Sequence, residues 1–161
     1  MRKTTFILPV LVLAVITVLS SIFIVDEREK ALVLQFGRVV SVKEDPGLAF
    51  KWPIIQNVVT YDDRILSREV GPLEITPEDD RRLIVDAFAR YRITDVEQFR
   101  RAVGAGGIAT AESRLDSILR SQTRAILGTV SSDDILSSDR ATLMLRIRNG
   151  AIAEARALGL E

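Results

Sequence analysis

The sequence contains no cysteine and no histidine among its 161 residues. Without cysteine the chain can form no disulfide and has no thiolate nucleophile. Without histidine it lacks the commonest general base and the commonest metal ligand. Serine and threonine are plentiful but have no histidine to activate them, so a Ser–Lys pair is the nucleophilic arrangement that composition leaves open.

The chain also lacks an excess of charge of either sign. It has 22 Lys and Arg against 22 Asp and Glu, so the formal net charge is zero. When Arg2 and Lys3 are set aside, 20 basic and 22 acidic residues remain, a net charge of −2. Nucleic-acid-binding domains usually carry a basic excess. The charge balance therefore argues against nucleic acid as a partner.

The first long feature is a charge-free apolar run over residues 6–25. About twenty such residues form a helix long enough to cross a ~30 Å hydrocarbon layer. The sequence therefore predicts a single transmembrane helix over residues 6–25, in which the large apolar side chains face lipid. These side chains belong to Phe6, Leu8, Leu11, Leu13, Ile16, Leu19, Ile22, Phe23 and Val25.

Two other interpretations of this run compete with a transmembrane helix. A buried core helix is rarely apolar on every face for this length in so small a domain. A cleaved signal peptide would explain the basic residues Arg2 and Lys3, but its apolar region would be shorter and would end at a small-x-small site. Here the run ends at the charged residues 26–29. We therefore expect an uncleaved anchor.

The charges that flank the anchor predict its orientation. Arg2 and Lys3 precede the run, and the net acidic residues 26–29 follow it. The positive-inside rule then keeps residues 1–5 in the cytoplasm as a short tail and sends residues 26–161 across the membrane.

A second apolar stretch, residues 48–55, follows the turn signal Asp45-Pro46-Gly47. It has two interpretations that the sequence leaves open. In one it is a core strand whose alternate side chains point inward; in the other it dips into the membrane interface, where tryptophan is favoured. The candidate interface residues are Leu48, Phe50, Trp52, Ile54 and Ile55.

The remaining pattern predicts strands first and helices second, which is typical of an α+β fold with helices on one face of a mostly antiparallel sheet. The clearest strand is 82–93, which we expect in the middle of that sheet, with alternate residues 83–93 facing one way and a hairpin across residues 77–80. We expect further strands at 30–39, with a bend at Gly37, and at 57–61, short pieces within 65–75, helices near 96–103, 109–127, 135–136 and 139–158, and the start of another strand at 160–161.

No set of residues predicts catalysis, a cofactor or a metal. The glycines of residues 104–107 match no phosphate-binding motif and join helix to helix. The three Asp-Asp pairs, at 62–63, 79–80 and 133–134, fit turn and cap chemistry better than a carboxylate dyad or a calcium loop. A Ser–Lys peptidase would depend on Lys30, Lys43 or Lys51, and it is the weakest hypothesis.

Several motifs together resemble a known family. They are EREKALVLQFGRVV, EDPGLAFKWPIIQNVVTYDDRIL, RLIVDAFARYRITD, VGAGG and SSDDILSSDR. The chain resembles the band-7 or SPFH domain shared by stomatins, prohibitins and flotillins. Within that family it is most similar to a bacterial inner-membrane branch whose two kinds of subunit assemble together and modulate a membrane-bound AAA+ protease.

This resemblance implies a non-enzymatic scaffold that is anchored in the bacterial inner membrane, faces the periplasm and encloses the protease. Its implied partners are a sister subunit, the protease and lipid. The resemblance also implies that residues 26–161 form an SPFH domain that stops before its last strand and a coiled coil. A stomatin-like or prohibitin-like organiser of membrane microdomains, with other partners, is the alternative.

Overall fold

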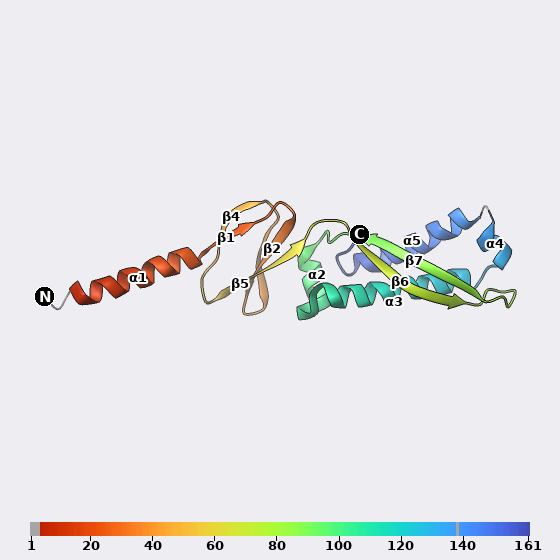
Figure 1. The fold of residues 1–161 in the computed structure, drawn as a ribbon, viewed down its shortest axis with the longest axis horizontal. Coiled ribbons are helices and arrows are strands. Elements are labelled where there is room, and N and C mark those ends of the chain that lie inside the picture. The colour runs from red at the N-terminus through yellow and green to blue at the C-terminus, as the bar shows by residue number, and fades with distance from the viewer. Residues whose placement is uncertain (1–3, 138) are drawn as a thin grey trace. The chain divides into compact units, whose positions relative to one another are not determined.

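The computed structural model describes residues 4–137 and 139–161, which fold as two compact units, Met1–Arg64 and Ile65–Glu161 (Figure 1). The first unit consists of α1 (Thr4–Ser20), β1 (Ile22–Val25), β2 (Glu29–Gln35), β3 (Arg38–Lys43), β4 (Gly47–Phe50) and β5 (Gln56–Asp62). The second consists of β6 (Leu66–Ile75), β7 (Leu83–Tyr91), α2 (Val96–Val103), the 3₁₀ turn η1 (Gly104–Gly106), α3 (Gly107–Leu127), α4 (Ser132–Leu136) and α5 (Arg140–Arg156).

The N-terminal helix is shorter than the sequence predicted. It ends at Ser20, and residues 22–25 form strand β1, so a helix through Val25 is wrong. Backbone N–H of Ser21 bonds to the carbonyl of Val18, which closes the helix, and the β-branched residues that follow favour a strand paired with β4. Among the described residues, none of the helices combines the length and the apolar character needed to cross a membrane.

Two residues expected to face lipid lie elsewhere. Val25 is buried in a small core with Ala31 and Ala49, and Phe23 packs against that core. Both point inward because β1 alternates its side chains between two faces. On α1 the side chains of Leu11, Leu13, Ile16 and Leu19 are exposed, and the predicted lipid contacts of Phe6 and Leu8 fall on side chains that the structure does not describe.

The first unit is built around a three-stranded antiparallel sheet in the order β3-β2-β5. Residues 31–34 of the central strand are buried on both faces. The sequence predicted one strand over 30–39 with a bend at Gly37. The structure instead has a tight hairpin, in which Phe36 and Gly37, with φ of 49° and 81°, join β2 to β3. Two consecutive residues with positive φ are typical of a type I′ turn.

The second unit begins with the antiparallel hairpin β6–β7. Strand β7 confirms the predicted strand and its alternation, because residues 83, 85, 87, 89 and 91 are the more buried ones. The prediction of short pieces over 65–75 is wrong. Strand β6 is continuous through Gly71 and Pro72 because a register shift between Val70 and Leu73 accommodates them. Within the described residues β7 pairs along its length with β6 only, so its predicted central place is not observed.

Helices α3 and α5 lie alongside each other, and α3 also contacts β6, as Figure 1 shows. The sequence predicted Thr94 or Asp95 as the cap of α2. The structure has Asp95 there, and its side chain accepts a hydrogen bond from the backbone N–H of Gln98. Leu160 forms a bridge with Ile93, which agrees with the expected start of a strand there. The second unit thus adds helices to an antiparallel sheet, and the α+β class is confirmed. Its core consists of Leu73, Ile75, Leu127, Ile135, Leu143 and Ile147.

A buried tyrosine gives this unit a pH dependence. The hydroxyl of Tyr91 donates to one carboxylate oxygen of Glu112 over 3.1 Å, and Arg68 donates to the other over 3.3 Å. Burial, with the negative charge of Glu112 beside it, raises the pKa of Tyr91 from 10.0 to about 12. A raised folded-state pKa means that this stabilisation is complete below pH 10 and is lost as the pH rises to about 12.

We expect Tyr91→Phe to lower the free energy of unfolding by about 1 kcal/mol at neutral pH, the usual value of one hydrogen bond. The variant should also lose less stability than the wild type between pH 10 and about 12. Denaturant unfolding across this range measures both effects. Equal losses of stability in the two proteins would contradict this assignment.

Candidate functional site

Strands β1 and β4 form a two-stranded ribbon with one protein-covered face and one open face. In the register Ile22 lies opposite Phe50, and Ile24 lies opposite Leu48. These four side chains share the open face and are exposed, whereas Val25 and Ala49 on the other face are buried. The open face therefore presents large apolar side chains in cross-strand pairs, which is uncommon on a protein surface that meets only water.

A short loop continues this apolar face from β4 to β5. The backbone N–H of Lys51 donates to the carbonyl of Ser21 over 2.8 Å, which ties the loop to the end of α1. The backbone N–H of Gln56 donates to the carbonyl of Trp52 over 3.0 Å, and the Gln56 side chain accepts from the backbone N–H of Trp52 over 2.8 Å. We call the open face and this loop together the apolar surface; it comprises Ile22, Ile24, Leu48, Phe50, Trp52, Ile54 and Ile55.

The structure rules out one of the two interpretations of residues 48–55. Leu48, Phe50 and Trp52 are 71–73% exposed, so the inward-pointing core strand is wrong. The small residue Ala49 takes the buried position instead, because the strand alternates about it. All five candidate interface residues lie on the apolar surface. Their contact with a membrane stays a prediction.

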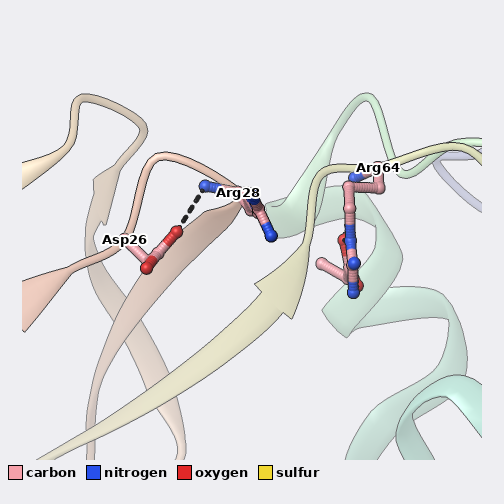
Figure 2. A network of polar contacts seen from close by, with 4 residues as sticks. Asp26, Arg28 and Arg64 are labelled. Atoms are coloured by element: carbon pink, nitrogen blue, oxygen red, sulfur yellow. Dashed lines mark hydrogen bonds and ion pairs between the residues drawn. The ribbon is translucent and has the colours of Figure 1, made fainter.

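The β2–β5 pair carries charged residues at the end where β2 begins and β5 ends, which is the end away from the apolar loop. Glu29 lies opposite Asp62 in the register, and the carboxylate of Asp26 accepts from the backbone N–H of Arg28 over 3.0 Å (Figure 2). Arg64 donates through Nε and Nη2 to the carboxylate of Asp62, and these hydrogen bonds lower the pKa of Asp62 to about 2. The first unit therefore has an apolar end and a charged end.

The remaining candidates for chemistry are used in structural contacts. Asp63 pairs with Lys30 over 3.1 Å, and Asp79 accepts from the hydroxyl of Ser132 over 2.7 Å, which lowers the pKa of Asp79. The Ser131 hydroxyl accepts from the backbone N–H of Asp134 and so caps α4. In the described part of the chain, no three His, Cys, Asp or Glu residues gather as a metal site would require.

Sequence reasoning missed Phe36. The period-two pattern placed it on one face with Leu32 and Leu34, both of which are buried. Phe36 is instead 86% exposed at the tip of the β2–β3 turn. The usable signal was the two-residue spacing of Phe36-Gly37 between two alternating segments, which is a hairpin pattern.

The apolar loop stores backbone strain at Ile54. Its φ is +74°, in the left-handed region that a β-branched residue rarely adopts, and its side chain is fully exposed. The left-handed conformation costs about 1–2 kcal/mol for such a residue. We expect Ile54→Asn, which tolerates this conformation, to raise the free energy of unfolding by about 1 kcal/mol.

Thermal unfolding of the full chain in detergent measures this gain. Val40→Asn is the matched control, because Val40 is also exposed and β-branched but lacks a positive φ. An Ile54→Asn protein no more stable than the control would show that the loop is unstrained.

The comparisons with known proteins agree with this architecture. The family model described as "SPFH domain / Band 7 family" matches residues 23–161. The chain therefore belongs to the SPFH/band-7 family, and the resemblance seen in the sequence motifs is confirmed.

Curated relatives that are similar to the chain include proteins named HflC. The chain is 29% identical over 155 residues to "Modulator of FtsH protease HflC" of Escherichia coli K12, covering 92% of the chain and 46% of the relative. It is 31% identical over 151 residues to "Protein HflC" of Vibrio cholerae, covering 90% of the chain and 46% of the relative. It is 32% identical over 157 residues to "Protein HflC" of Vibrio parahaemolyticus, covering 88% of the chain and 48% of the relative. The chain spans about half the length of these relatives.

Proposed function

We propose that the chain is a membrane-anchored scaffold subunit of an HflK–HflC-type complex, which modulates an FtsH-like AAA+ protease by enclosing it. Family membership and the name "Modulator of FtsH protease HflC" of a relative support this proposal. The observation that carries it is the apolar surface, which follows directly after a charge-free helix and has no protein cover in the described residues.

The first step of the proposal is the anchor. Helix α1 has 17 residues and reaches ~26 Å at ~1.5 Å per residue, a few ångströms less than the ~30 Å hydrocarbon layer. Its described side chains, such as Leu13 and Leu19, are exposed and apolar. The apolar surface after Ser20 would continue the contact with lipid into the interface, where tryptophan is favoured.

The second step is the placement of the folded units. Arg2 and Lys3 precede the helix, and an acidic segment follows β1. Under the positive-inside rule, residues 26–161 would lie in the periplasm of a bacterial inner membrane, with the N-terminus in the cytoplasm. The subunit then acts by geometry rather than catalysis, because neighbouring subunits fixed on one membrane restrict the access of membrane substrates to the protease.

Co-purification tests this proposal. The protein, gently solubilised from its native membrane, should bring down an HflK-like subunit and an FtsH-like protease. A bait carrying only residues 1–25 controls for capture by the helix. Recovery of neither partner would contradict the proposal. A cytoplasmic location of the two units, seen in reporter fusions, would favour a stomatin-like or prohibitin-like microdomain organiser instead.

A further inference from the structure

The tip of the β2–β3 turn presents an aromatic side chain to the exterior. Phe36 is 86% exposed and has a φ of 49°, a conformation that usually selects glycine or asparagine. Either residue would make the same turn at lower cost, and a side chain that is 86% exposed gains little from packing. Its position indicates a role outside the folded unit.

Phe36 emerges from the same end of the sheet as the apolar loop. In the register Gln35 lies opposite Gln56, and the two side chains meet over 3.5 Å. Gln35 directly precedes Phe36, and Gln56 directly follows Ile55. The turn and the loop are therefore neighbours at the end of the first unit that is tied to the end of α1.

The β2–β3 turn and the apolar loop each contain a non-glycine residue with a strained, positive φ. Among the described residues the non-glycine positions with positive φ are Phe36, Ile54 and Asp80. The first two are large, apolar and exposed, and both lie at this end of the first unit. Strained backbone that persists in a fold is often found at functional positions. Here it holds two apolar side chains outward.

A positively charged side chain also lies next to the β2–β3 turn and next to the apolar loop in the sequence. Arg38 follows the turn by two residues, and Lys51 precedes Trp52. Long cationic side chains beside apolar ones can reach lipid phosphates while their stems lie along apolar surface. The charged residues of the opposite end, such as Glu29 and Asp62, lie about 20 Å away along a seven-residue strand at ~3.3 Å per residue.

We propose that the β2–β3 turn is a second membrane-contact element, with Phe36 entering the interfacial layer of the bilayer beside the apolar loop. Two separate contacts would fix the tilt of the first unit on the membrane, which a single loop cannot do. The inference rests on the proposed function, because it uses the membrane placement of the apolar surface. The occupant is lipid rather than a protein partner, because the turn continues the exposed apolar end next to α1.

The test uses single nitroxide labels, because the chain has no cysteine of its own. Phe36→Cys, Ile54→Cys and Glu27→Cys are labelled separately in the full chain reconstituted in liposomes of neutral and anionic phospholipid. Glu27 is the control, since it is exposed in the β1–β2 turn at the charged end. Labels at 36 and 54 should collide more with oxygen than with a water-soluble nickel complex, and the label at 27 should do the reverse.

Each outcome has one meaning. A label at 54 in lipid and a label at 36 in water would overturn the inference and leave the proposed membrane placement intact. Labels in water at both positions would overturn both. A label at 36 shielded from both collision partners would show a protein partner and overturn the inference. Because Phe36→Cys removes the side chain in question, Phe36→Trp in a Trp52→Phe background, quenched by brominated lipid, supplies a second reading that keeps an aromatic residue.

Discussion

Gly159→Ala is expected to lower the free energy of unfolding of the second unit by about 3 kcal/mol or more. The φ of Gly159 is +75°, and an added Cβ would lie 2.5 Å from the carbonyl oxygen of Asp95 and 2.8 Å from the backbone N of Phe99. Both contacts are with backbone in the first turn of α2, which cannot move without losing its own hydrogen bonds. Thermal unfolding followed by the helical signal measures the loss.

Gly104→Ala is the matched control for this prediction. Gly104 also has a positive φ, of +63°, but nothing lies within 4 Å of the position of its Cβ. Its φ of 63° with a ψ of −141° is a region that non-glycine residues rarely enter, so its substitution should cost the conformational strain alone, about 1–3 kcal/mol. If both variants lose the same stability, the close approach of the α2 backbone is not the reason that position 159 requires glycine.

The triple substitution Leu48→Ser, Phe50→Ser, Trp52→Ser is expected to raise amide exchange in residues 47–56 about 100-fold when the full chain is in liposomes. If each large side chain contributes about 1 kcal/mol of partial burial in the interface, their loss removes about 3 kcal/mol of local stability. At 1.4 kcal/mol for each factor of ten, this corresponds to roughly 100-fold. Hydrogen exchange with mass spectrometry resolves this segment.

Ile84→Ser with Phe88→Ser is the control. These residues are 74% and 75% exposed on β7, so the pair also removes large exposed apolar side chains, but from the second unit. Exchange in residues 47–56 should remain unchanged in this variant. An equal rise in both variants, or no rise in the triple variant, would show that the apolar surface does not lie on the bilayer.

The sequence predicted elements where a single local rule decided them. The alternation of residues 83–91 predicted β7, and a capping residue at Thr94 or Asp95 predicted the start of α2, where Asp95 is the cap. The prediction from sequence failed where pairing between distant strands determines the secondary structure. Residues 22–25 continue an apolar run that reads as helix, yet pairing with β4 turns them into a strand. Similarly, a register shift lets β6 continue through Gly71 and Pro72, which a local pattern treats as a break.

The candidate site shows the same division. Composition identified residues 48–55 as unusual, but burial cannot be derived from hydrophobicity alone. Only the pairing of β4 with β1 decides that Ala49 points to the core and Phe50 outward. Phe36 was missed because alternation places a turn residue on the same face as the strand residues before it.

Fluorescence of the single tryptophan tests the central claim most directly. Trp52 is 71% exposed in the structure, so water should surround it unless the bilayer covers it. In the full chain reconstituted in liposomes, we expect emission shifted to the blue relative to the unfolded chain and strong quenching by lipids brominated near the headgroup end of the acyl chain. Emission at the wavelength of the unfolded chain, quenched by iodide and untouched by brominated lipid, would contradict the account.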